Sequence, residues 1–133
     1  MRILFLVAML ALSACGSAPG GGSVPDGDDR GGSVLAYAST IAAHDGPVRL
    51  SGYCASACTM WLGHEQACIE PGARFGFHRV RRDFTGQMQP FYEAHLPRGL
   101  RDWYRANAAD SDAMLRLSGS RIVRNGWAPA CAT

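Results

Sequence analysis

Four cysteines after residue 50 constrain the fold of this chain more than any other feature of its sequence. They are Cys54, Cys58, Cys68 and Cys131, and a fifth, Cys15, lies near the N-terminus. A chain of 133 residues builds one small core, and small cores of exported proteins commonly depend on disulfides. The even number of cysteines therefore predicts two disulfides, although three pairings are open and the spacing favours none of them.

The same stretch raises the alternative of a metal site, because Cys54, Cys58 and Cys68 lie close to His64 in the sequence. Structural zinc sites use paired Cys-x-x-Cys spacings, and this stretch contains no such pair. Thiols of exported proteins also tend to oxidise. We therefore expect no metal ion and no cofactor.

The N-terminus has the pattern of an export signal. Met1 and Arg2 precede an apolar run over residues 3–12, which is too short to span a bilayer. The letters LSAC that follow resemble the lipobox of bacterial lipoproteins. This resemblance implies a signal peptide over residues 1–14, a lipidated Cys15 and an acyl anchor in the lipid bilayer, with Gly16 typical of the outer membrane. The alternative is an ordinary signal peptide; in both cases we expect a protein of the bacterial cell envelope that faces the periplasm.

Residues 15–30 are rich in Gly, Ser, Pro and Asp and lack apolar periodicity, which predicts a flexible tether. Residues 31–133 then make one domain. Their patterns predict helices over 32–43 and 55–62, strands from Val48 to Gly52 and over 67–70 and 74–78, and a helical region over 89–106 broken at Pro97. A short helix and an irregular tail finish the chain. This alternation predicts an α/β fold with a small, partly parallel sheet and packed helices.

The charge pattern gives no sign of a nucleic-acid partner. The formal net charge is only +2, every basic residue is arginine, and no long basic stripe occurs. The run Arg79, Arg81 and Arg82 has two interpretations: it binds an anionic substrate or lipid headgroup, or it is a solvated edge of the protein.

The stretch SGYCASACTMWLG, residues 51–63, places Ser56 between two cysteines. A strand ending before a helix at Ser56 puts the serine at the helix N-terminus, where the amide of Ala57 and the helix dipole favour a developing negative charge. Gly31 and Gly32 offer further amides, and His78, at the end of a strand, is a candidate general base. The plainer interpretation is that Ser56 caps the helix and His78 is structural.

Three motifs in order, GGSV, GYCASACTMWLG and PGARFGFHRV, resemble the Clp protease proteolytic subunit and its crotonase-superfamily relatives, above all small periplasmic proteins with CASACT and FH motifs. The resemblance covers roughly residues 31–82 and implies a reduced, disulfide-stapled ClpP/crotonase-like fold. It implies oxyanion glycines at Gly31 and Gly32, a nucleophile turn at Gly52, Ala55 and Ser56, a second oxyanion amide at Ala57, and a histidine strand at Pro71, Arg74 and His78.

Two departures limit what the resemblance implies. Superfamily members have a strand, a helix and a strand before the glycine pair, where this sequence has the predicted tether. They also use a later aspartate to orient the histidine; the candidates here are Asp110 and Asp112, since Asp83 is too close in sequence.

The expected function is a periplasmic serine hydrolase, peptidase-like, in which a Ser56–His78 dyad acts with the amides of Gly32 and Ala57 as the oxyanion hole. Its substrate would be a peptide or a small ester or amide. The alternative is a catalytically inactive binding or scaffold lipoprotein of the cell envelope.

Overall fold

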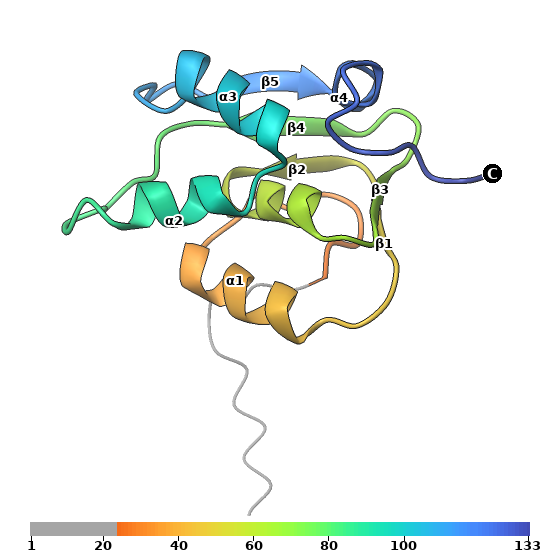
Figure 1. The fold of residues 1–133 in the computed structure, drawn as a ribbon, viewed down its shortest axis with the longest axis horizontal. Helices are drawn as coiled ribbons and strands as arrows, with labels where there is room; N and C mark the ends of the chain where they lie inside the picture. Colours follow the sequence, from red (N-terminus) through yellow and green to blue (C-terminus); the bar gives the residue numbers. More distant parts are fainter. Residues whose placement is uncertain (1–23) are drawn as a thin grey trace, which may run out of the picture.

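A computed structural model describes residues 24–133 and has a mixed α/β architecture (Figure 1). The expected signal peptide, Cys15 and the first part of the expected tether lie outside the described residues. In chain order the elements are α1 (Val34–Ala43), β1 (Val48–Leu50), β2 (Tyr53–Ala55), the 3-10 helix η1 (Ser56–Gly63), β3 (Ala67–Ile69), β4 (Arg74–Phe77), α2 (Met88–Ala94), α3 (Arg98–Asn107), β5 (Leu115–Ser118) and α4 (Gly119–Arg124).

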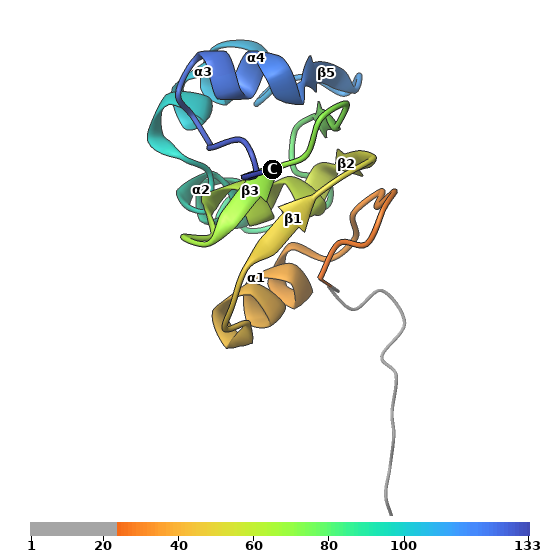
Figure 2. The ribbon, with the colours of Figure 1, turned by 90° about the vertical axis from the view of Figure 1, so that its right-hand side faces the viewer.

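The strands form two small sheets, and the expectation of a small, partly parallel sheet is confirmed. In the larger sheet β4 lies between β2, to which it is parallel, and β5, to which it is antiparallel. The other sheet is the parallel pair β1 and β3. Figures 1 and 2 both show α1 at one end of the molecule and α3 and β5 at the other, with β2 between them.

The helix η1 lies at the centre of the core, because all its residues from 57 to 62 are buried. The largest fully buried side chains include Trp61, Phe75 and Phe77. Tyr104 is fully buried as well, and Trp103 is partly buried against the same cluster. No helix within residues 24–133 has the length and apolarity that crossing a bilayer requires.

Both expected disulfides are present, and the structure supplies their pairing. One joins Cys54 to Cys58 with 5.4 Å between the Cα atoms, and so brackets the turn at Ser56. The other joins Cys68 to Cys131 across 63 positions and ties the C-terminus to β3. Since the four sulfurs bond to one another, they are not free as the thiolate ligands that the zinc alternative required.

Two expectations for the strands need correction. The strand expected from Val48 to Gly52 ends at Leu50, because Gly52 has a φ of 63° and turns the chain before β2 begins at Tyr53. The C-terminal stretch, expected to be a short helix followed by an irregular tail, instead begins with β5, which pairs with β4 and precedes α4. The alternation in β5 is short: Leu117 is buried and its neighbours Arg116 and Ser118 are exposed.

The folded domain also begins before residue 31, because Asp29, which was expected in the tether, pairs with β2. The Asp29 amide donates to the Tyr53 carbonyl at 2.7 Å, and the Ala55 amide donates to the Asp29 carbonyl at 2.8 Å. Asp29 therefore pairs alongside Cys54 in a parallel bridge. Composition alone misplaced this boundary, because these bonds join backbone groups, which leave no local pattern in the sequence.

Candidate active site

Ser56 occupies a sharp turn between β2 and η1. Its φ is 57°, in the left-handed region that non-glycine residues seldom enter and that costs on the order of 1–3 kcal/mol. A serine on a strained strand-to-helix turn is also how α/β-hydrolases expose a nucleophile. The position before η1 is Ala55, and no side chain caps this helix. The interpretation of Ser56 as a helix cap therefore does not describe this structure.

Two buried hydroxyl groups, those of Thr59 and Tyr92, stabilise this turn. The Thr59 hydroxyl donates to the Ser56 carbonyl at 2.6 Å and lies 2.5 Å from the hydroxyl of Tyr92 on α2. Because the hydrogen of Thr59 is used on Ser56, Tyr92 is the donor in the second bond. Burial raises the pKa of Tyr92 well above its usual value, so the tyrosine keeps that hydrogen.

The glycine pair packs directly on the serine turn. Gly31 has a φ of 84°, and a Cβ at this position would lie 2.6 Å from the Ala55 carbonyl oxygen and 2.8 Å from Ser56 Cβ. Its amide donates to Asp29 Oδ1 at 2.8 Å, and the hydroxyl of Tyr37 on α1 donates to the same oxygen at 2.5 Å. Only glycine fits at this position, so the loop and the turn act as one packed unit.

Two backbone amides next to Ser56 remain available for a ligand. Within residues 24–133 the Gly32 amide donates to no protein acceptor, whereas the Gly31 amide is used on Asp29. Ala57 is the second residue of η1, and amides in the first turn of a helix have no partner inside it. Gly32 and Ala57 are the residues whose amides the sequence predicted as oxyanion donors, and that role stays a prediction.

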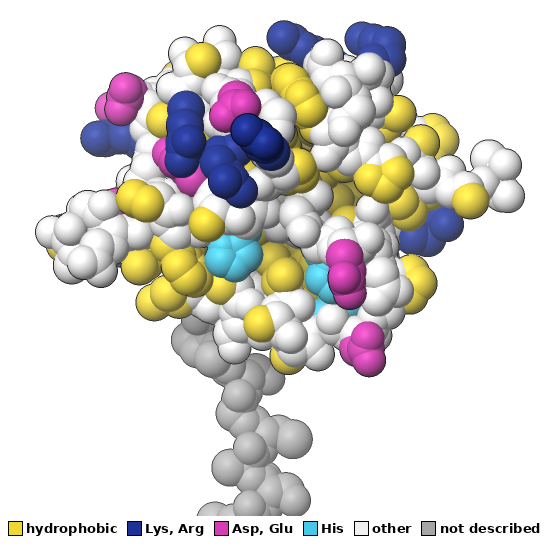
Figure 3. Space-filling model, viewed as in Figure 1, with side chains coloured by type: hydrophobic (Ala, Val, Ile, Leu, Met, Phe, Trp, Pro, Cys, Tyr) yellow, Lys and Arg dark blue, Asp and Glu magenta, His cyan; other side chains and the backbone are white. Residues whose placement is uncertain are grey.

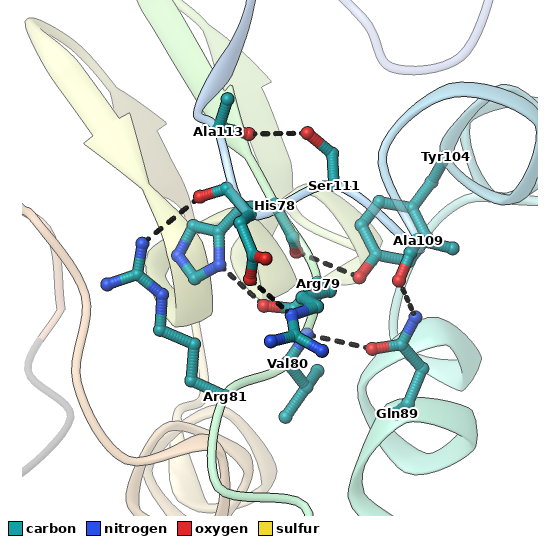
Figure 4. Close-up of polar contacts among 10 residues, drawn as sticks. His78, Arg79, Val80, Arg81, Gln89, Tyr104, Ala109, Ser111 and Ala113 are labelled. Atoms are coloured by element: carbon teal, nitrogen blue, oxygen red, sulfur yellow. Dashed lines mark hydrogen bonds and ion pairs between the residues drawn. The ribbon is translucent and has the colours of Figure 1, made fainter.

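His78 follows β4 directly, and both its backbone and its ring are held (Figure 4). The hydroxyl of Tyr104 on α3 donates to the His78 carbonyl at 2.9 Å, and ring Nδ1 lies 2.5 Å from the Arg79 carbonyl oxygen. A carbonyl can only accept, so Nδ1 carries a hydrogen, and in the neutral ring the lone pair then lies on Nε2. We infer this neutral tautomer from the hydrogen bond. It is the form that a general base requires.

The Arg79 carbonyl takes the place that the sequence assigned to an aspartate. Asp112 Oδ1 accepts from Arg79 Nε at 2.5 Å, and the Asp112 carbonyl accepts from Arg81 at 3.2 Å. In the described part of the chain neither Asp110 nor Asp112 bonds to the His78 ring. Sequence reasoning missed this partner because a backbone carbonyl has no residue signature.

A single cavity of about 660 Å³ contains all the predicted catalytic and oxyanion residues. Within residues 24–133 the Ser56 hydroxyl and the His78 ring line this cavity without a hydrogen bond between them. Such bonds are often long before a substrate binds and tighten in the complex. The lining residues comprise Ser56, Ala57, His78, the segments 30–35 and 79–82, Met88, Tyr92 and Met114.

Three buried tyrosines, one for each segment of the site, are the residues that sequence reasoning overlooked. Tyr37 acts through Asp29 on the glycine loop, Tyr92 through Thr59 on the serine turn, and Tyr104 on the histidine carbonyl. All three are almost fully buried, and burial is the main cause that raises each pKa. The only signal in the sequence was their position: Tyr37 falls in the predicted helix over 32–43, and Tyr92 and Tyr104 fall in the predicted helical region over 89–106.

The comparisons with known proteins give no family for this chain. No protein-family model matches it, and a search of the curated proteins found no match. The resemblance carried by the three motifs therefore stays a prediction, and the functional conclusion depends on the geometry of the site.

Gly31→Ala tests the packing of the glycine loop on the serine turn. Gly27→Ala is a matched control, because Gly27 has a similar φ of 81° but open space where its Cβ would lie. We expect the control to lower the free energy of unfolding by about 1–2 kcal/mol, the cost of a left-handed alanine. Gly31→Ala should lower it by roughly 1–3 kcal/mol more, because the methyl group meets backbone atoms. Equal losses in urea unfolding would show that the loop and the turn do not pack as described.

The three buried tyrosines predict a loss of stability at alkaline pH. Above pH 10.0, the ordinary tyrosine pKa, each ionises only when the protein unfolds, so the unfolded state holds fewer protons. Their contribution is constant below that pH, and above it the free energy of unfolding should fall by about 1.4 kcal/mol per pH unit for each tyrosine. Tyr104→Phe should make this slope shallower by the contribution of one tyrosine, about 1.4 kcal/mol per pH unit. An unchanged slope in this variant would contradict the burial of Tyr104.

Proposed function

We propose that this protein is a serine hydrolase that cleaves a peptide bond or a small ester or amide, with Ser56 as nucleophile and His78 as general base. The observation that carries the proposal is the strained turn at Ser56, which shares one cavity with His78 and two unused amides. A serine that only caps a helix and a histidine that is only structural would not need a strained turn, a shared cavity and two unused amides in the same place.

In the first half of the reaction, His78 Nε2 takes the proton of the Ser56 hydroxyl while Oγ bonds to the substrate carbonyl carbon. The carbonyl oxygen becomes an oxyanion, which the amides of Gly32 and Ala57 stabilise. When the tetrahedral intermediate collapses, the bond to the leaving amine or alcohol breaks and that group takes the proton from His78. In the second half, Nε2 takes a proton from water while the water oxygen bonds to the acyl carbon. The bond from that carbon to Ser56 Oγ then breaks, Oγ takes the proton back from Nε2, and the acid leaves.

The Arg79 carbonyl limits how strongly the dyad is activated. It fixes the tautomer and orientation of the ring, which are two roles of the aspartate in a triad. It carries only a partial negative charge, so it stabilises the developing imidazolium less than a carboxylate does. We therefore propose a Ser–His dyad rather than a triad.

The fold family and the cellular location are two further parts of the proposal. We propose a reduced ClpP/crotonase-like domain, supported by the order of glycine loop, serine turn and histidine strand and by the parallel pair β2 and β4. We further propose a lipid anchor at Cys15 and a periplasmic location, supported by the LSAC motif and by two disulfides in so small a domain.

The second candidate is a catalytically inactive binding or scaffold lipoprotein. It is favoured by the lack of a Ser56–His78 hydrogen bond and of a carboxylate on the His78 ring within residues 24–133. An assay of serine reactivity separates the two candidates.

A fluorophosphonate probe reports that reactivity, because a serine oxygen that loses its proton to a base displaces fluoride from phosphorus. We expect the parent protein to be labelled, Ser56→Ala not to be labelled, and His78→Asn to be labelled at least 100-fold more slowly. Ser39→Ala, on the exposed side of α1, is the matched control and should react like the parent. Absence of labelling in folded parent protein, or labelling that survives Ser56→Ala, would overturn the proposed function.

A further inference from the structure

The cavity at Ser56 is lined by an unusual set of charges. Four arginines contribute to its wall, and no aspartate or glutamate of the described chain does; the four are Arg30, Arg79, Arg81 and Arg82. The whole chain has a formal net charge of only +2, so positive charge is concentrated at this cavity. Figure 3 shows basic side chains gathered above a histidine on one face of the molecule.

The four arginines differ in how far their charge is neutralised. Arg79 forms an ion pair with Asp112, and Arg81 donates to the backbone carbonyl of the same residue. Arg30 and Arg82 are exposed and form no ion pair within residues 24–133. Asp83, next to Arg82, accepts the amides of Met88 and Gln89, and these bonds hold the pKa of its carboxyl below the usual value.

Apolar residues line the same cavity as the four arginines. Val34 and Leu35 come from the start of α1 and Val80 from the loop after β4. Met88 begins α2, and Met114 immediately precedes β5. A neutral polar ligand would leave the charges without a counterion, and a purely apolar ligand would leave them next to hydrocarbon. A ligand with an apolar chain that ends in an anion satisfies both parts of the wall.

From this lining we propose that the cavity selects substrates in which the hydrolysable ester or amide is joined by an apolar chain to a carboxylate. The inference rests on the proposed function and adds the substrate class. Arg30 and Arg82, whose side chains form neither an ion pair nor a hydrogen bond within residues 24–133, bind the carboxylate. Ser56 attacks at the other end of the chain. The bonds that form and break are those of the hydrolysis described above, because the carboxylate only positions the substrate.

A matched pair of esters tests the substrate class. Mono-4-nitrophenyl suberate carries a carboxylate, and its methyl ester has the same chain without the charge. After the rate of Ser56→Ala is subtracted, we expect kcat/KM to favour the charged ester about tenfold at low ionic strength, the size of one charged contact. Because salt screens exposed charges, the ratio of the two kcat/KM values should fall towards one in roughly 0.5 M NaCl. A ratio of one or less at low salt would overturn the inference.

The arginine variants show where the preference arises. The double variant Arg30→Gln/Arg82→Gln should bring the ratio of the two kcat/KM values to within about twofold of one. Arg124→Gln, at an exposed position on α4 away from the cavity lining, is the matched control and should keep the full ratio. If the control lowers the ratio as much as the double variant, general charge explains the preference and the inference is wrong.

Binding to Ser56→Ala separates this inference from the proposed function. Suberanilic acid and its methyl ester are amides of the same chain, and calorimetry measures their affinities without any reaction. We expect the acid to bind about tenfold more tightly, and the two arginine substitutions to remove that difference. If the parent hydrolyses neither ester, the proposed function fails and this binding result alone decides the inference. Equal hydrolysis of both esters leaves the function standing and overturns the substrate class.

Discussion

The close contact between the glycine loop and the turn at Ser56 is the constraint on which the rest of the site depends. Gly31 lies so near Ala55 and Ser56 that a methyl group in its place would overlap the backbone. The left-handed conformation of Ser56 is costly by itself and persists because its surroundings hold it. The Cys54–Cys58 disulfide brackets the turn, and the buried helix η1 begins at the serine, so both restrict it further.

The helices contribute to the site through buried hydroxyl groups. Tyr37 on α1, Tyr92 on α2 and Tyr104 on α3 each donate a hydrogen bond that ends, directly or through one residue, on a segment of the site. Tyr92 and Tyr104 also pack edge to face with their ring centroids 5.2 Å apart, which links the supports of the serine and the histidine. A domain this small thereby positions three separate segments without an extensive sheet.

Local patterns in the sequence were enough to predict the alternation of helices and strands, the two disulfides, and the cavity residues Ser56, Ala57 and His78. They were not enough for β5, whose four-residue alternation is too short to distinguish from a helix or a tail. The support from Asp29 and the Arg79 carbonyl depends on long-range hydrogen bonds or on backbone atoms, which leave no periodicity in the sequence. The sequence therefore indicated candidate residues for the site, and the structure supplies how they are held.

The most direct measurement of the central claim is a crystal structure with phenylboronic acid, which mimics the tetrahedral intermediate when a serine oxygen bonds to boron. The account predicts a bond from Ser56 Oγ to boron, with one boronate oxygen about 3 Å from the amides of both Gly32 and Ala57. The other boronate oxygen should lie within hydrogen-bond reach of His78 Nε2. A boronate that leaves Ser56 unmodified, or an adduct whose oxygens contact neither amide, would contradict the assignment of this cavity as an active site.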